Sequence, residues 1–499
     1  FAPRPLFGEA EGGFVMRLAW GDRRIGEPVR WDAPPEGGGP DLARAEINNL
    51  HFMEYLEGAG DAAFARLVRD WIAGNPPRAK GASRHAWRPY NLSLRVFVWL
   101  GELARRPGLD PAFRALAGAS IAAQLDHLAG HLETDLRGNH LVKNVKALLW
   151  GAAAFEGPAG ERWRRLGLRR LDAEIKEQIL ADGCHYERSP AYHCQVLADF
   201  VECRAVLEPG PLRDRLDAAV RRMLPAMRLL THPDGLVAPL NDGGLRMAHP
   251  PAAILDAWRA LAGEAPPPPP SGPFALADAG YYGLATPDER VVVDCGPLEP
   301  AYLAGHAHGD LLAVEWSTGG RRVLVDQGTF QYVAGPGRAA TRATASHNTV
   351  TLDGRDQSDF HGAFRVGRRA RPLSPLFEVK GSGFRFMGSH DGYDVLPGAP
   401  RHHREVEASP GRLLVRDRIA GGRGQKAEAR YLLHPDCALE ADGDGFLIEN
   451  GPVTIRAMAD RPLRVEPASW FPDLYVALPT RRLVAAFDGH LTVRFERLA

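Results

Sequence analysis

Long apolar stretches are absent from this sequence. No run of about 18 or more apolar residues occurs, whereas a membrane-spanning helix needs roughly 20. We therefore expect no transmembrane helix and no membrane partner. The chain starts at Phe1 rather than at a methionine, and a removed export signal leaves no trace in a mature sequence. A periplasmic or secreted location is favoured if such a signal was removed, and a cytoplasmic location stays open otherwise.

Cysteine is scarce and odd in number, and an excess of charge of one sign is missing. No two cysteines have CxxC spacing, so neither a disulfide framework nor a cysteine zinc site is indicated. The 61 Lys and Arg residues balance 61 Asp and Glu residues. This balance argues against a general nucleic-acid or membrane-surface binder and allows a local basic groove for a polyanion. The cysteines are Cys184, Cys194, Cys203, Cys295 and Cys437.

The 499 residues exceed one ordinary hydrophobic core, so we expect two or more domains. Residues 1–40, with Trp20 and Trp31, are predicted to form an irregular covering segment. From about residue 41 to 261, apolar residues recur at helical spacing between short connections. This pattern indicates antiparallel helices in hairpins, a bundle or a closed α/α ring. The predicted helices are Leu42–Leu56, Ala63–Ile72, Leu92–Leu103, Phe113–Leu132, Leu141–Phe155, Trp163–Leu180, Tyr192–Leu207 and Leu212–Leu230.

A proline-rich stretch, Ala265–Pro273, cannot be helical and marks the predicted domain boundary. After it, short segments rich in β-branched residues lie between Gly, Asp and Pro, which is typical of antiparallel sheets. We therefore predict a β-sandwich or stacked sheets. The clearest strands are Arg290–Asp294, Leu311–Ser317, Arg321–Asp326, Asn348–Leu352, Leu413–Arg418 and Leu491–Phe495.

The stretch Asp182–His193 is the richest in chemistry. Ser189 is a good N-cap and Pro190 suits the first helical position, so a helix is predicted from Ala191, with Tyr192 in its first turn. A tyrosine at a helix N-terminus lies where the dipole eases a phenol toward phenolate, which suits proton transfer. The alternative interpretation is a turn whose polar side chains only satisfy buried backbone groups.

Two further segments carry polar residues in suggestive spacing. In the segment 138–144, Asn139 and Lys143 share one helix face, and His140 and Asn144 share another. The alternative is that Asn139 is only an N-cap.

The segment Gly305–Asp310 precedes a predicted strand, and alternation places His306 and His308 on the same side of an extended backbone. Asp326 and His347 could join His308 in a His/Asp/His metal site, a set that zinc accepts well.

Together these motifs resemble the bacterial heparinase II/III-like polysaccharide lyases. The resemblance covers most of the chain: the segment 87–95 (WRPYNLSLR), then 139–140, 185–193, 305–310 and 347–350. It implies an α+β multidomain protein with an incomplete α/α toroid at 41–265, an antiparallel β-sandwich domain at 274–499 and an active cleft between them.

The resemblance also implies roles for individual residues. Asn139, His140, Tyr192 and His306 match catalytic residues of the family. Substrate binding is expected from Arg88, Tyr90, Glu187, Asn241 and Arg342. His308, Asp326 and His347 match zinc ligands of some members, while other members hold a different ion or none, and we expect a divalent metal, Zn²⁺, in a structural role. One departure concerns Lys143, because some relatives carry a glutamate there.

Lyases of this kind remove the C5 proton of a uronic acid and expel its 4-O substituent, which leaves an unsaturated sugar. We expect a lyase whose partner is an anionic polysaccharide of the glycosaminoglycan type, such as heparan sulfate, hyaluronan or chondroitin. Tyr192 together with the two histidines His140 and His306 would permit both C5 epimers, and Tyr192 and His306 are expected on opposite cleft walls. The oligomeric state stays open.

Three alternatives remain at this stage. The first is a lyase for alginate or a bacterial exopolysaccharide. The second is a non-catalytic carbohydrate-binding protein of the same fold. The third is a hydrolase, which needs two carboxylates at a set separation. Its candidate acids are Glu133, Asp135, Glu187 and Asp242.

Overall fold

Helices in this protein usually begin at a proline, which fits the first helical position because its missing N–H needs no partner there. The computed structural model describes residues 1–35, 40–77, 85–302 and 304–498. Its α-helices are α1 (Pro40–Phe52), α2 (Asp61–Gly74), α3 (Pro89–Arg105), α4 (Pro111–Gly130), α5 (Gly138–Ala154), α6 (Pro158–Gln178), α7 (Pro190–Arg204), α8 (Pro211–Leu229), α9 (Pro251–Ala262) and α10 (Pro336–Arg342). The predicted helices from 42 to 230 are thus confirmed within a few residues at each end.

The chain divides into two compact units. Unit 1 comprises Phe1–Glu177 and Ala198–Ala218, and unit 2 comprises Gln178–Leu197 and Ala219–Ala499. The chain passes from one unit to the other three times, at the end of α6, within α7 and within α8. This division differs from the predicted domain limits, which stay a prediction. The change from helices to strands nevertheless falls at the proline-rich stretch, because α9 ends at Ala262 and β4 begins at Gly272.

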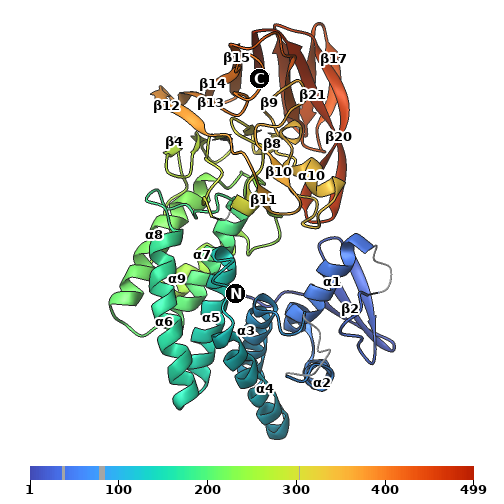
Figure 1. Cartoon of the computed structure of the whole chain (residues 1–499), viewed down its shortest axis with the longest axis vertical. Helices are drawn as coiled ribbons and strands as arrows, with labels where there is room; N and C mark the ends of the chain where they lie inside the picture. The colour runs from blue at the N-terminus through green and yellow to red at the C-terminus, as the bar shows by residue number, and fades with distance from the viewer. Residues whose placement is uncertain (36–39, 78–84, 303, 499) are drawn as a thin grey trace. The chain divides into compact units, whose positions relative to one another are not determined.

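Unit 1 is built on helix packing around aromatic residues. Helix α3 packs against α4 and α5 (Figure 1). Trp71, Trp99 and Phe113 are fully buried in the core of this unit. The prediction of an irregular N-terminal segment is wrong, because β1 (Phe7–Ala10), β2 (Gly13–Leu18) and β3 (Gly21–Gly26) form an antiparallel sheet.

Unit 2 contains the antiparallel sheets, and side chains from three of them share one core that includes Trp316, Tyr431 and Phe495. The first sheet is β4 (Gly272–Leu276), β5 (Tyr281–Ala285), β6 (Arg290–Asp294), β7 (Val314–Thr318) and β8 (Arg321–Leu324). The second, in spatial order, is β20 (Leu463–Asp473), β21 (Val476–Phe487), β16 (Ala427–Leu432) and β9 (Val350–Leu352).

The third sheet is the largest, and its strands alternate buried and solvent-facing side chains, as in β14. Its spatial order is β12 (Pro372–Lys380), β13 (Gly383–His390), β14 (Arg401–Ser409), β15 (Arg412–Ala420), β22 (His490–Arg497), β19 (Val453–Ala459), β18 (Gly445–Asn450) and β17 (Ala438–Asp442). A separate hairpin joins β10 (Phe360–His361) to β11 (Arg365–Val366), and short 3₁₀ turns lie at η1 (Glu54–Gly58), η2 (Ala304–His306) and η3 (Thr344–Ser346).

The predicted fold class, α+β multidomain with a helical part followed by antiparallel sheets, is therefore confirmed. Among the described residues, no helix has both the length and the apolar character that a membrane span requires.

Candidate active site and metal centre

Helix α7 starts as its sequence predicts. The Tyr192 backbone N–H donates to Ser189 Oγ at 3.2 Å, which confirms Ser189 as the N-cap. The Ser189 hydroxyl also donates to the Asp242 carbonyl oxygen at 2.5 Å. The start of the helix is thereby fixed to the loop that carries Asp242.

Two non-glycine residues beside this helix start have a left-handed backbone. Arg188 has φ 51° and Asn241 has φ 60°, and the Asn241 side-chain amide donates to the Arg188 carbonyl at 2.9 Å. Such conformations are unfavourable by about 1–3 kcal/mol and concentrate at functional sites. The hydrogen bond between the two residues holds both in place.

Tyr192 lies against two other aromatic residues of unit 2. Its hydroxyl donates to the Tyr332 hydroxyl at 3.1 Å, and its ring centroid is 4.1 Å from that of His306. Only 6% of Tyr192 is exposed. A sugar ring between Tyr192 and His306 would need about 3.5–4 Å of contact distance on each side, and the two rings are too close together to leave that space. The expectation that they occupy opposite walls of a cleft is therefore wrong.

A fully buried carboxylate, Asp242, holds His306. Its Oδ2 lies 3.0 Å from His306 Nδ1 and its Oδ1 lies 2.8 Å from His308 Nε2. The guanidinium of Arg338 donates to both oxygens, at 2.7 Å from Nη2 to Oδ2. Burial alone would raise the pKa of Asp242, but Arg338 and the two imidazoles hold it well below its usual range.

The ionised state of Asp242 fixes the tautomers of both histidines. A carboxylate can only accept, so His306 donates from Nδ1 and His308 donates from Nε2. In the neutral form of each ring, the free lone pair is then on Nε2 for His306 and on Nδ1 for His308. The first is a suitable proton acceptor, and the second is a suitable metal ligand.

His308, Asp310 and His347 form a buried group suited to a metal ion. One ligand atom from each lies within 4.8 Å of the others. His308 Nδ1, Asp310 Oδ2 and His347 Nε2 are buried without a hydrogen-bond partner among the described residues. Unsatisfied buried polar atoms are costly, and two imidazoles with a carboxylate are ligands that zinc accepts, so these residues fit a divalent ion.

The carboxylate of this group is Asp310, whereas the sequence pointed to Asp326. Asp326 Oδ2 lies 2.7 Å from His347 Nδ1, and its Oδ1 accepts from the Gly328 N–H at 3.0 Å. Asp326 therefore orients His347 from behind and leaves Nε2 for a metal. Burial raises the pKa of Asp310 to about 6, and a neighbouring cation would favour its ionised form.

Purified protein is expected to contain about one divalent ion per chain. The substitution Asp310→Asn should lower the bound metal more than Asp326→Asn does, because a ligand is lost in the first case and an orienting partner in the second. Elemental analysis of protein prepared without chelator measures this. The variant His402→Gln is the control, because His402 is equally buried but bonds to Asp417. Protein without stoichiometric metal would contradict the assignment.

In unit 1, His140 and Asn144 both bond to the carboxylate of Glu133. His140 Nδ1 lies 3.2 Å from Glu133 Oε1, and Asn144 Nδ2 donates to Glu133 Oε2 at 3.1 Å. The shared face of His140 and Asn144 is thus confirmed. Tyr90 packs on His140 with 4.4 Å between ring centroids.

Two other predicted site residues, Asn139 and Arg88, lie at the N-terminal ends of helices α5 and α3. Asn139 is buried in the first turn of α5, and the residue before the helix is Arg137. The alternative interpretation of Asn139 as an N-cap is therefore wrong. Arg88 directly precedes α3 and is half-buried.

Lys143 has a structural environment in unit 1. Its ammonium donates to Asp199 Oδ1 at 2.8 Å, and Lys146 contacts the same oxygen at 2.7 Å. Burial lowers the pKa of Lys143, although Asp199 opposes this shift. The lysine that replaces the glutamate of some relatives is therefore part of a buried ion-pair network.

Two of the residues predicted to bind substrate have other roles. Asn241 accepts from the His308 N–H at 3.0 Å with its Oδ1, so both ends of its amide are used. Arg342 is fully buried and donates from Nε and Nη2 to the Ala307 carbonyl, at 3.1 Å each. Neither side chain offers its polar group to a ligand, so both position the loop that carries His308.

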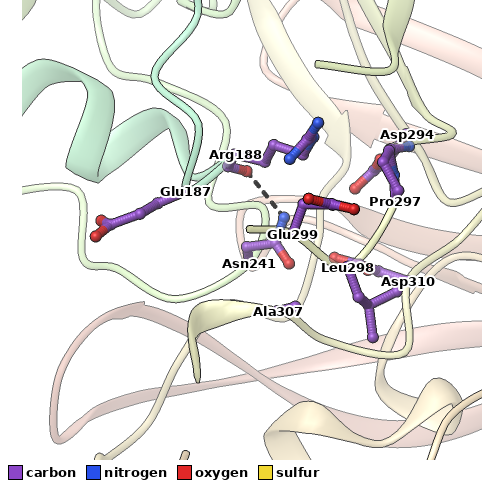
Figure 2. A pocket seen from close by; sticks show the side chains of 10 residues that line it. Glu187, Arg188, Asn241, Asp294, Pro297, Leu298, Glu299, Ala307 and Asp310 are labelled. Carbon is purple, nitrogen blue, oxygen red and sulfur yellow. Dashed lines mark hydrogen bonds between the residues drawn. The ribbon is translucent and has the colours of Figure 1, made fainter. Parts of the chain in front are cut away.

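Glu187 is also buried, with Oε2 3.8 Å from His185 Nδ1. It borders a cavity of about 10 Å³ beside Asn241 and Asp310, and Figure 2 shows its side chain turned away from the other lining residues. This cavity has the volume of about one water molecule and is too small for a sugar ring.

Sequence reasoning missed Arg338 and Tyr332 and gave Asp242 a different role. The turn Asn241-Asp242-Gly243 was a signal that a polar loop lies here, and Asp310 ends the segment that carries both histidines. Tyr332 and Arg338 had no comparable local signal. The extended backbone predicted for 305–308 was wrong in part, because His306 ends the 3₁₀ turn η2.

Comparisons with known proteins give a consistent result. Residues 58–259 match the family described as Heparinase II/III N-terminus, and residues 268–495 match Heparinase II/III-like, C-terminal. A heparin-sulfate lyase of Pedobacter heparinus is 26% identical over 377 residues, which cover 68% of this chain and 56% of the relative. The chain thus spans less than two thirds of that lyase.

The chain is also similar in sequence to a protein that is not named as a lyase, and similar in structure to a heparinase III. The FtsZ-localized protein C of Caulobacter vibrioides is 26% identical over 427 residues, which cover 77% of this chain and 71% of that protein. The crystal structure of a heparinase III has a TM-score of 0.75 at 17% identity and covers 94% of this chain and 79% of that chain. At this identity the structural similarity shows the fold.

Proposed function

Because the chain belongs to the heparinase II/III-like family, we propose that it is a polysaccharide lyase for a uronic-acid polymer of the glycosaminoglycan type. The observation that carries this proposal is the contact of the Tyr192 hydroxyl with Tyr332 and of the Tyr192 ring with His306. The heparin-sulfate lyase among its relatives supports the substrate class.

The proposed reaction is a β-elimination. A base takes the C5 proton beside the carboxylate, the electron pair forms the C4–C5 double bond, and the C4–O bond breaks. The leaving oxygen receives a proton, and no water is consumed. Tyr192 is the proposed proton donor to that oxygen, and either the Tyr192 phenolate or His306 Nε2 is the proposed base.

Charge that builds on the substrate carboxylate needs stabilisation in the transition state. We assign this task to Asn139 and His140, whose residue types supply an amide and an imidazole for hydrogen bonding. The ion at His308, Asp310 and His347 would supply no step of the chemistry. It would hold the segment from which His306 projects.

A panel of heparan sulfate, hyaluronan, chondroitin and alginate tests the proposal. The expected result is an ultraviolet-absorbing unsaturated product from at least one glycosaminoglycan. Reducing ends that appear without such absorbance would indicate a hydrolase. That outcome is disfavoured because Asp242 and Glu133, two of its candidate acids, are each bonded to histidine.

A second candidate is a non-catalytic protein of the same fold that binds a carbohydrate without turnover. The specific observation in its favour is the similarity to FtsZ-localized protein C, of which more is covered than of the Pedobacter lyase. Binding of a polymer without release of any product from the complete panel would support it over the lyase.

The variant His306→Ala is expected to lose activity to a similar extent on a glucuronate polymer and on an iduronate-rich one. The contact between Tyr192 and His306 leaves no space for a sugar ring between two opposed bases, so His306 assists both substrates from one side. Measuring kcat/KM for the two polymers gives ΔΔG‡ for each. A loss confined to one epimer would restore the two-base mechanism.

A further inference from the structure

The hairpin β10–β11 presents an exposed aromatic ring next to the candidate catalytic residues. Phe364, at the turn before β11, is 45% exposed. Its ring centroid lies 5.8 Å from that of Tyr332 and 6.2 Å from that of His306. An exposed aromatic ring is common on proteins when isolated, but this one extends a cluster that includes Tyr192.

Two buried arginines of α10 fix the backbone of this hairpin. Arg338 Nε donates to the Ala363 carbonyl at 2.8 Å. Arg342 Nη1 donates to the Ala363 and Arg365 carbonyls at 3.3 and 3.4 Å. Charge-assisted bonds to carbonyls on both sides of Phe364 hold its ring in a defined position, which the tip of a short hairpin does not have by itself.

Arg338 also links the hairpin to the candidate catalytic histidine. The guanidinium that binds Ala363 pairs with Asp242, which in turn holds His306. It lies 5.3 Å from the Phe364 ring centroid and 5.4 Å from that of Tyr332. One buried cation, Arg338, therefore contacts the rings of Phe364 and Tyr332 and is linked through Asp242 to His306.

We propose that Phe364 is a sugar-binding platform, against which a pyranose ring of the polymer packs beside His306. This inference rests on the proposed lyase function. The C–H groups of a pyranose face are apolar and suit an aromatic surface, and burying them removes apolar area from water. The adjacent Arg365 is exposed and supplies positive charge for the carboxylate or sulfate of such a sugar.

The substitution Phe364→Leu tests the platform, because leucine keeps apolar bulk against Tyr332 and lacks a flat face. The expected result is a roughly tenfold higher KM for the polymer, about 1.4 kcal/mol, with kcat within about twofold. Phe364→Trp, which keeps a flat aromatic face, should have a KM close to that of the unsubstituted protein. Val379→Ala is the control, because Val379 is 63% exposed on strand β12 of the third sheet.

Polymer binding to a Tyr192→Phe background, measured by calorimetry, gives a second readout without turnover. Adding Phe364→Leu should weaken that binding about tenfold. An unchanged KM, or a lower kcat at unchanged KM, would overturn the platform even if the lyase reaction is present. Absence of product from the unsubstituted protein on every polymer would instead refute the proposed function.

Discussion

Replacing Tyr192 by phenylalanine is expected to lower kcat by roughly 10²–10⁴-fold, the contribution of one general acid–base group. The substitution removes only a hydroxyl, whose hydrogen bond goes to Tyr332 at 3.1 Å. The ring remains in contact with His306, and the Ser189 cap of α7 is unaffected because it binds the Tyr192 backbone. Folding should therefore be preserved. Steady-state kinetics and thermal unfolding of the same preparation measure the two effects.

Tyr393→Phe is the matched control for this variant. Tyr393 is fully buried in the shared core of the sheets, and its hydroxyl donates to the Val350 carbonyl at 2.7 Å. Removing that hydroxyl should lower the free energy of unfolding by about 0.5–1.5 kcal/mol and leave kcat unchanged. If Tyr192→Phe kept more than about a tenth of the rate, Tyr192 would not be the acid–base group.

The features that the sequence predicted well are local ones. Ser189 and Pro190 lie next to the helix that they start, so cap chemistry alone located Tyr192. The strand Arg290–Asp294 was predicted to the residue because its β-branched run is bounded by charged residues and turns. Periodicity and punctuation report such short-range preferences directly.

The N-terminal sheet β1–β2–β3 was missed although a signal was present. Strands β1 and β2 form a hairpin that is closed by the pair Ala10 and Gly13. Gly12, in the connection between them, has φ 68°. A short connection with glycine at a left-handed position is a hairpin signal.

The contacts that organise the site are long-range, and sequence spacing does not report them. Asp242 is 64 residues from His306 and 96 residues from Arg338. The choice between Asp310 and Asp326 had the same difficulty, because both flank the strands near His308 and only the fold decides which one faces the ion site. The family resemblance supplied Tyr192 and His306 without the carboxylate that positions His306.

The substitution Asp242→Asn should reduce metal content and turnover together. An amide accepts through one oxygen only, so it cannot bind His306, His308 and Arg338 at once. His308 then loses the partner that directs its Nδ1 toward the ion site, an effect of roughly 10–100-fold in metal affinity. His306 loses the tautomer that leaves Nε2 free, and kcat should fall by roughly 10²-fold or more.

Loss of fold stability must be separated from these effects, because removing one partner of a buried ion pair lowers the free energy of unfolding by about 3–5 kcal/mol. Asp417→Asn is a close match for this comparison. Asp417 is buried and accepts from His402 Nε2 at 2.7 Å and from Arg404 Nε at 2.7 Å, in the sheet core. Both variants should lower Tm by similar amounts, and only Asp242→Asn should lose metal and kcat when assayed well below Tm. Equal metal content and equal kcat in the two variants would mean that Asp242 only stabilises the fold. His306 would then be positioned by the backbone of η2 and the Tyr192 ring, which Asp242→Asn leaves in place.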